Sequence, residues 1–129
     1  VTDAALNALD RERYLSLETF KKNGDGVKTP VWFARSGNAL YVFTDGTSYK
    51  VKRVGRDSRA RIAGCNANGS KFTTSWFDAK ATLLSPGSEE DSAYAALRSK
   101  YGLQMKLLDL GSRIAGRIGR RKVIKLEPT

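Results

Sequence analysis

Two clusters of turn-forming residues divide the first third of the chain into three short segments with the composition of β-strands. The first cluster is Asn23-Gly24-Asp25-Gly26 and the second is Ser36-Gly37-Asn38. Glycine and asparagine adopt the positive φ angles that tight hairpin turns need, so each cluster predicts a reversal of the chain. The segments around them, 14–20, 27–34 and 39–44, are rich in apolar, β-branched and aromatic residues. This pattern predicts three antiparallel strands in a meander.

Further strands are predicted along the rest of the chain. Pro30 lies inside the middle segment, and because proline donates no backbone hydrogen bond, that strand should lie at a sheet edge or a bulge. Residues 60–66 predict a fourth strand, and Lys71–Leu84, after the turn at Asn68-Gly69, predict a long fifth one. Residues 123–126 alternate as a closing strand does. Many strands with little parallel crossover indicate a barrel.

Helices are expected beside these strands. Apolar spacing predicts helices over 2–9, 89–100 and 103–114, and a basic helix is predicted to start after Ser48. No internal repeat or linker divides the chain, and 129 residues suffice to bury about two-thirds of the unfolded surface. We therefore expect one domain over residues 1–129, of the α+β class and dominated by antiparallel β-structure.

The helix predicted to follow Ser48 has an unusual start. Lys50, Lys52 and Arg53 fall in its first turns, and no acidic residue accompanies them. The N-terminus of a helix carries partial positive charge, so each cation there is unfavourable by about 0.3–1 kcal/mol. The segment 88–91 follows the usual rule instead, since Ser88 is predicted to cap a helix whose first turn holds three acids.

A bound anion would reverse this electrostatic cost. We therefore predict a phosphate site at the helix start, formed by hydroxyl groups, backbone N–H groups and Lys50. A solvated basic turn without a ligand is the alternative interpretation of the same residues.

The composition restricts the possible chemistry. The chain has no histidine, so catalytic triads that need one are excluded, and a metal site would have to use carboxylates or one thiol. No metal site is predicted. The single cysteine, Cys65, lies in an apolar stretch and is expected to be buried. Without an internal disulfide, a signal segment or an apolar run of about 20 residues, a cytoplasmic protein with no membrane span is expected.

The charge of the chain predicts an anionic partner. The 23 Lys and Arg against 13 Asp and Glu leave a formal net charge of +10. Nucleic acid, an acidic membrane face and a polyanionic cofactor would each fit. The cations gather in two clusters, Lys50–Arg61 and the group Arg113, Arg117, Arg120, Arg121 and Lys122. Two clusters suit a groove, although a solvated surface also explains the second one.

The order of these features resembles that of the split β-barrel flavin and deazaflavin oxidoreductases related to pyridoxamine 5′-phosphate oxidase. The shared order is a helix, the meander, the pattern Thr44-x-x-x-Ser48-x-Lys50, the basic helix, a long hairpin and a helix. Within that superfamily, Leu17–Phe20, Gly26–Phe33 and Tyr101–Gln104 resemble the branch that uses coenzyme F420. The resemblance covers almost the whole chain and implies a split β-barrel with flanking helices and an F420-dependent oxidoreductase.

The resemblance also implies which residues hold the cofactor. Thr44, Ser48 and Lys50 would bind its phosphate, with Thr47 and Arg53 as weaker candidates. This site coincides with the one predicted from helix electrostatics. The backbone of one further segment would form hydrogen bonds with the edge of the isoalloxazine-type ring, and that segment is Lys28, Thr29, Pro30, Val31 and Trp32.

One departure from the family pattern bears on the cofactor. Flavin-using relatives tend to have an arginine where this chain has Tyr49, which favours F420 over FMN. F420 carries a phosphate-linked acidic oligoglutamate tail, and Lys52, Arg56 and the Arg-rich C-terminal region would line its path. Trp32 could equally be a core aromatic residue.

The family resemblance further implies a homodimer with two cofactor grooves at the subunit interface. Residues near Trp76 would complete each groove from the opposite subunit, with buried interface packing as the alternative for this side chain. The reduced cofactor would supply a hydride to a small organic substrate that the sequence does not identify. No residue stands out as a general acid, so the catalytic residues are not predicted.

Two functions of other classes remain open from the sequence. A small basic barrel with aromatic strands is also typical of an OB-type module that stacks bases on aromatic rings and tracks phosphates with cations. A protein that carries F420 without turnover would use the same binding residues as the enzyme.

Overall fold

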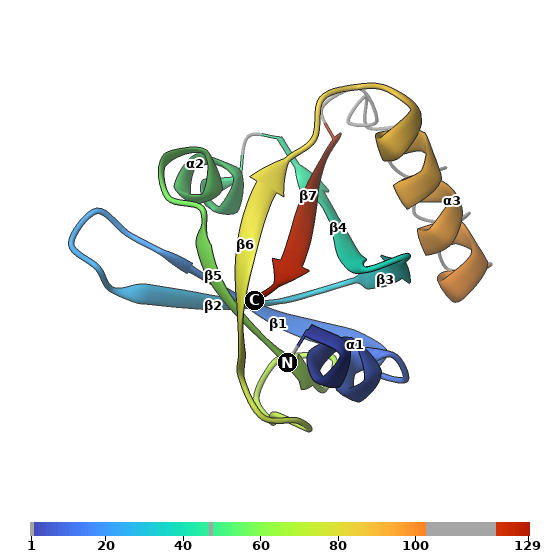
Figure 1. Ribbon diagram of the computed structural model, residues 1–129. Helices are drawn as coiled ribbons and strands as arrows, with labels where there is room; N and C mark the ends of the chain where they lie inside the picture. The colour runs from blue at the N-terminus through green and yellow to red at the C-terminus, as the bar shows by residue number, and fades with distance from the viewer. Residues whose placement is uncertain (1, 47, 103–120) are drawn as a thin grey trace.

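The computed structural model describes residues 2–46, 48–102 and 121–129. These residues form a curled, antiparallel sheet of seven strands in the order β2-β1-β5-β6-β7-β4-β3, with three helices on its periphery (Figure 1). The strands are β1 (Tyr14–Phe20), β2 (Gly26–Val31), β3 (Phe33–Ser36), β4 (Ala39–Asp45), β5 (Arg59–Cys65), β6 (Phe77–Leu83) and β7 (Arg121–Pro128). This half-barrel confirms the predicted strand-dominated split β-barrel.

The predicted meander is wrong in one respect, because its middle segment is two strands. β2 pairs with β1, β3 pairs with β4, and only Trp32 separates β2 from β3 along the chain. These two strands nevertheless lie at opposite ends of the strand order. The sheet must therefore curl until its two edges approach each other at Trp32. Pro30 lies in an edge strand, as predicted, but the predicted strand is interrupted two residues later, at Trp32.

The core fills the concave side of the sheet. Side chains alternate between the two faces of a strand, so every second residue of β1 points inward. Leu15 and Leu17 of β1 are fully buried together with Leu40, Ile62 and Leu126 from other strands. In β6 the buried residues alternate with exposed ones, as expected for a strand with one face in the core.

Three helices cover parts of the sheet. Helix α1 (Thr2–Leu9) buries Leu6 and Leu9, and α2 (Tyr49–Arg56) buries Val54 and packs against β1 and β6. Helix α3 (Ser88–Tyr101) packs against β3 and β4. Ser88 does not cap α3 as the sequence suggested, because it is the first helical residue and Gly87 takes the cap position without a side-chain hydrogen bond.

The segment predicted as a long strand from Lys71 is a strand only from Phe77 onward. Before it, residues 66–76 form a loop in which the Asn68-Gly69 turn is present as predicted. Asn66 and Lys71 exchange hydrogen bonds across this turn, which satisfies backbone groups that a strand ladder would otherwise pair. Gly69 has φ +75°, and a Cβ there would lie 3.2 Å from Cδ of Pro30, so this loop packs on β2.

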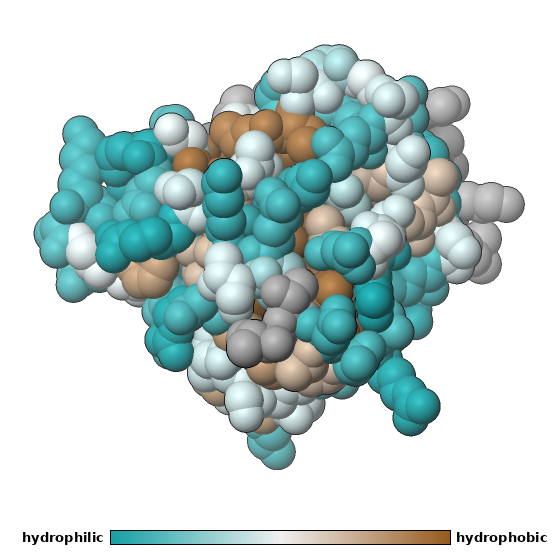
Figure 2. All heavy atoms as spheres, viewed as in Figure 1, coloured by the Kyte–Doolittle hydropathy of each residue, from teal (hydrophilic) through white to brown (hydrophobic). Residues whose placement is uncertain are grey.

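The predicted helix over 103–114 lies outside the described residues. Within the described part of the chain, no helix combines the length and apolar character that crossing a bilayer requires. Hydrophilic side chains dominate the face of the molecule shown in Figure 2, with smaller apolar areas between them. This distribution agrees with the large excess of basic residues in the sequence.

Replacing Leu17 by alanine should reduce the free energy of unfolding by about 2–5 kcal/mol, because it leaves a cavity where the concave faces of β1, β2 and β5 meet. Chemical denaturation measures this change. Thr82→Ala, at an exposed position of β6, is the control and should stay within about 0.5 kcal/mol of the wild type. Equal effects of the two substitutions would contradict the assignment of the concave face as the core.

Candidate functional site

A pocket of about 290 Å³ lies where the two edges of the sheet meet. The end of β2, the residue after it, the end of β4 and the first turn of α2 each contribute to its wall. The lining residues are Pro30, Val31, Trp32, Phe43, Thr44 and Lys50. Five of these six were predicted from the sequence to hold the cofactor. The tertiary structure thus brings together residues from 30 to 50 that the sequence assigned to one site.

The cationic end of the pocket is built by the connection between β4 and α2. Ser48 has extended backbone angles and caps α2, with its Oγ accepting a hydrogen bond from the N–H of Val51 at 3.4 Å. Thr44 Oγ1 lies 3.4 Å from the same Ser48 oxygen. The two hydroxyl groups and Lys50 therefore lie together at the start of α2.

Lys50 is a half-buried cation in this pocket. Burial, and second the nearby charge of Arg53, lower the pKa of Lys50 from its ordinary value of 10.5. The first turn of α2 contains no acidic residue, and none of the ion pairs among the described residues involves Lys50. A desolvated cation without a carboxylate partner gains stability from an anionic ligand.

Aromatic rings form the other end of the pocket. Trp32 is half-buried, and its indole stacks on the ring of Tyr101 with centroids 4.6 Å apart and planes 14° apart. Phe43 meets the indole edge to face at 6.2 Å. Trp32 is thus both a packed residue and a pocket wall, so the two interpretations of this side chain are compatible.

The side chain of Tyr101 forms hydrogen bonds with the backbone at the junction of β2 and β3. Its hydroxyl accepts a hydrogen bond from the N–H of Phe33 at 3.0 Å and lies 2.6 Å from the carbonyl oxygen of Arg13 and 3.0 Å from that of Phe33. Burial raises the pKa of Tyr101 to about 12. The hydroxyl therefore stays protonated at physiological pH and can donate to a carbonyl.

Lys100 lies beside this junction. Its Nζ is 3.4 Å from the centroid of the Phe33 ring. Burial lowers the pKa of Lys100 to about 8, with a smaller contribution in the same direction from Arg13, while Asp10 and Glu12 act in the opposite direction.

Thr29, the neighbour of Pro30 in β2, carries a buried polar atom close to the pocket. Thr29 pairs with Leu17 in the sheet register, so its side chain points to the concave face. Its Oγ1 is buried and has no hydrogen-bond partner among the described residues. A buried hydroxyl usually finds a partner, so this atom is available to a ligand group that approaches β2.

Other predicted site residues lie outside the pocket. Arg53 turns toward β1 and donates a hydrogen bond from Nε to Thr19 Oγ1 at 2.6 Å. Lys52 is exposed, with its Nζ 5.3 Å from the ring of Tyr49. Arg56 donates to the carbonyl oxygen of Phe20 at 2.9 Å. Thr47 lies outside the described residues.

Lys28 and Trp76 lie on the convex face of the sheet. Lys28 pairs in register with Glu18, so it points away from the core, and its Nζ lies 5.2 Å from the Trp76 ring. Arg61 approaches the same ring at 5.3 Å, and Phe72 packs against it with centroids 5.0 Å apart. The described residues of this chain therefore do not bring Lys28 or Trp76 into the pocket.

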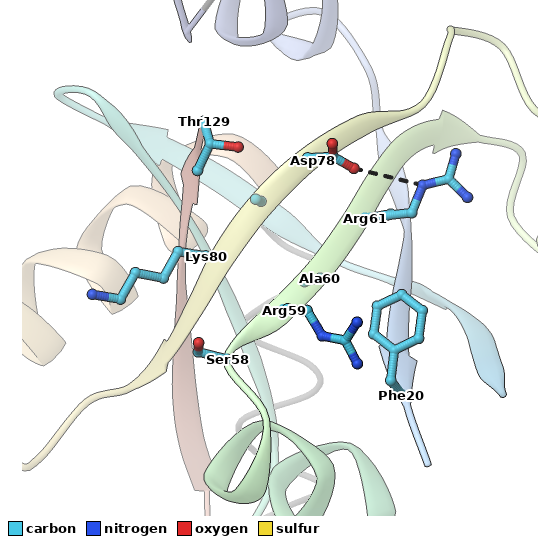
Figure 3. A pocket seen from close by; sticks show the side chains of 9 residues that line it. Phe20, Ser58, Arg59, Ala60, Arg61, Asp78, Lys80 and Thr129 are labelled. Atoms are coloured by element: carbon cyan, nitrogen blue, oxygen red, sulfur yellow. Dashed lines mark ion pairs between the residues drawn. The ribbon is translucent and has the colours of Figure 1, made fainter. Parts of the chain in front are cut away.

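A second, larger hollow of about 450 Å³ lies over β5 and β6 (Figure 3). Its arginines already have acidic partners. Arg59 forms a close ion pair with Asp57 at 2.8 Å, which lowers the pKa of Asp57 to about 2, and Arg61 lies between Glu18 and Asp78 at 3.4 and 3.7 Å. The smaller pocket is the better candidate for an anionic ligand, because no acid in the described part of the chain compensates the charge of Lys50.

Two residues of the site had no role in the sequence prediction. Phe43 lies directly before Thr44 in a predicted strand, and this position next to a predicted phosphate ligand could have indicated that it lines the pocket. Tyr101 appeared only as part of a family phrase, because the contacts of its hydroxyl are with residues 68 and 88 positions away. Sequence spacing carries no information on such distant contacts.

Comparisons with known proteins identify the family of the chain. A model of the pyridoxamine 5′-phosphate oxidase family matches residues 1–129, and the chain belongs to this family. Comparison with curated proteins finds no significant match.

Solved structures show the same fold at low sequence identity. The heme storage protein HutZ from Vibrio cholerae has a TM-score of 0.74 at 14% identity, over 98% of this chain and 89% of that one. The conserved hypothetical protein Rv2991 from Mycobacterium tuberculosis has a TM-score of 0.71 at 14% identity, over 95% and 77%. A heme binding protein from Mycobacterium smegmatis has a TM-score of 0.65 at 16% identity, over 97% and 50%.

Replacing Lys100 by methionine should change how stability depends on pH. The pKa of Lys100 is about 8 in the folded protein and near 10.5 in the unfolded chain, so the unfolded chain binds more protons between these values. The free energy of unfolding of the wild type should therefore rise relative to that of Lys100→Met as pH increases from 8 to 10.5. Denaturation at several pH values measures the difference, with Lys22→Met at an exposed position as the control. Parallel pH profiles of wild type and Lys100→Met would contradict the pKa shift.

Proposed function

We propose that the chain is an oxidoreductase that binds coenzyme F420 in the pocket between β2, β4 and α2 and transfers a hydride to or from a small organic substrate. The observation that carries this proposal is that an aromatic wall and a desolvated Lys50, which has no acidic partner among the described residues, meet in one pocket. A phosphorylated cofactor with a planar ring has the matching chemistry at its two ends.

The phosphate end of the ligand would lie at the start of α2. Lys50 supplies the positive charge, and Thr44 and Ser48 supply hydroxyl donors. Backbone N–H groups at a helix start add further donors, since they have no acceptors within the helix. These residues fit a phosphate better than a neutral group because no acid among the described residues neutralises Lys50.

The ring end would lie against Pro30, Val31 and Trp32. β2 is an edge strand, so one side of its backbone has no strand partner and remains free for hydrogen bonds with a ring edge. The unpartnered Thr29 hydroxyl offers another hydrogen bond beside it. The deazaflavin ring supplies the hydride chemistry when bound, and the chain orients it and limits its access to water.

Two features favour F420 over FMN. Tyr49, which stands where flavin-using relatives tend to have an arginine, is 73% exposed and does not line the pocket. An acidic oligoglutamate tail would also complement the net charge of +10, and we expect Lys52, Arg56 and the Arg-rich C-terminal region to line its path. FMN binding by the same pocket is the alternative within the family.

We propose a homodimer as the functional unit. Lys28 and Trp76 lie on the convex face with the exposed ring of Phe72, so they can reach a cofactor only if it belongs to a second subunit. The partner is expected to place Trp76 near the groove.

The cytoplasm is the compartment that we propose, since a single cysteine allows no internal disulfide.

Heme binding is a second candidate, because two of the similar structures are described as heme proteins. This sequence contains no histidine, and burial raises the pKa of its one thiol, Cys65, which disfavours the thiolate that ligates iron.

A role as an F420 carrier without turnover is supported by the same residues as the enzyme. Nucleic-acid binding is the least supported candidate, since the aromatic rings described here are mostly packed against one another.

Titrations of the protein with three ligands test these alternatives. Binding of F420 and of FMN is followed by fluorescence, and binding of hemin by absorbance. We expect saturable F420 binding with one site per subunit and higher affinity than for FMN. Reduced F420 incubated with a panel of electron acceptors then separates an enzyme from a carrier. Stronger binding of FMN would reject the F420 assignment, and binding of hemin alone would reject the flavin-type function.

Replacing Lys50 by alanine should weaken F420 binding by roughly ten- to a hundredfold, because a charge-assisted hydrogen bond contributes about 1.5–3 kcal/mol. The folded state should be unaffected, since no described ion pair depends on Lys50. Lys22→Ala is the matched control, as it removes the same charge from an exposed turn far from the pocket in sequence and in fold. An unchanged dissociation constant for Lys50→Ala would contradict the phosphate site.

A further inference from the structure

We propose that Tyr101 is a positioning residue that holds the indole of Trp32 in place as the ring-facing wall of the pocket. This inference rests on the proposed function, because it assigns the wall to a ligand with a planar ring. It makes the last residue of α3, which does not line the pocket itself, a determinant of ring affinity.

The hydroxyl of Tyr101 holds the backbone on both sides of the sheet junction. It accepts from the N–H of Phe33, and because it has one proton, it donates chiefly to the nearer carbonyl oxygen, that of Arg13 at 2.6 Å. Arg13 directly precedes β1, which is the neighbour of the edge strand β2, and Phe33 begins β3, the strand at the opposite edge, so one oxygen atom joins segments from the two sides of the opening. Trp32 is the residue immediately before this anchor.

The ring of Tyr101 holds the Trp32 side chain directly. The two rings are nearly parallel and 4.6 Å apart, so Tyr101 occupies one face of the indole. Phe43 meets the indole edge to face. Trp32 also lines the pocket, and rotation of the indole would lose the stacking contact with Tyr101.

Tyr101 is itself held firmly by its own helix. Its side chain is 4% exposed, and Leu97, one turn earlier, is fully buried in the same cluster. The helix ends with the N–H of Gly102 bonded to the carbonyl oxygen of Arg98 at 2.8 Å. A fixed helix end is a suitable support for a side chain that must stay within a few tenths of an ångström.

If Tyr101 had only a structural role, its replacement would change the stability of the protein and not selectively its affinity for a ring. The test therefore compares binding of the ring end of the ligand with binding of its phosphate end. Tyr101→Phe keeps the ring and removes the hydroxyl, whereas Tyr101→Leu removes both. Tyr41→Phe is the matched control, because it deletes the hydroxyl of another buried tyrosine, which donates to Glu89 away from the pocket. The probes are F420 and 5-deazariboflavin, which has the ring but no phosphate.

For Tyr101→Phe we expect affinities for F420 and 5-deazariboflavin to fall together by about tenfold, and by more for Tyr101→Leu. The salt dependence of F420 binding should remain that of the wild type, since the ionic contact at Lys50 is intact. Lys50→Ala should show the opposite result, with a weaker salt dependence and unchanged affinity for 5-deazariboflavin.

Fluorine NMR of protein labelled with 5-fluorotryptophan reads the position of Trp32 without any ligand. The chain has two tryptophans, so two signals are expected, and a Trp76→Phe sample assigns them. The Trp32 signal should shift or broaden in Tyr101→Phe and lose its ring-current shift in Tyr101→Leu. It should not move in Tyr41→Phe.

Wild-type ring affinity together with an unmoved Trp32 signal in Tyr101→Phe would overturn the inference. So would an equal loss of affinity in Tyr41→Phe, which would indicate a general loss of stability. If the wild type binds neither F420, FMN nor 5-deazariboflavin, the proposed function fails instead. In that case the fluorine spectra alone still decide whether Tyr101 positions Trp32.

Discussion

The chain passes from one edge of the sheet to the other within a single residue, and the rest of the structure depends on this crossing at Trp32. The strands β2 and β3 would otherwise form one continuous strand. Because they pair at opposite ends of the sheet, the sheet has to curl and leave an opening where its edges meet. The hydroxyl of Tyr101 secures that opening by bonding the backbone on both sides. The pocket exists because the barrel does not close there.

Charge compensation separates this pocket from the rest of the basic surface. Arg59 and Arg61 have carboxylate partners on the convex face, so their charge is largely satisfied within the chain. Lys50 is half-buried, has a lowered pKa and lacks such a partner among the described residues. Burying a cation without an acidic partner costs free energy, so an anionic ligand contributes most binding free energy at such a cation. Net charge alone would not have distinguished these residues.

Much of the fold followed from local chemistry. The strand β1, the turns at Gly24 and Gly69 and the basic helix after Ser48 were predicted because each depends on neighbouring residues. The predicted start of β6 was too early, because residues 71–73 pair with the end of β5 only in an isolated bridge between Cys65 and Phe72, and the N–H of Gly64 bonds to the Thr74 hydroxyl in place of a strand carbonyl. The break at Trp32 was missed because strand pairing, which decides it, links residues far apart in sequence.

Apart from the break at Trp32, the sequence by itself determined the succession of the described strands and helices. It also determined the basic, acid-free helix start at Lys50 and the residue types of the pocket, because these depend on composition and short-range spacing. Only the tertiary structure decided that Lys28 and Trp76 face away from that pocket, through the strand register and the loop before β6. It alone placed Tyr101 behind Trp32. The physical reason is that side-chain facing and long-range packing depend on which strands pair, and pairing is a property of the whole sheet.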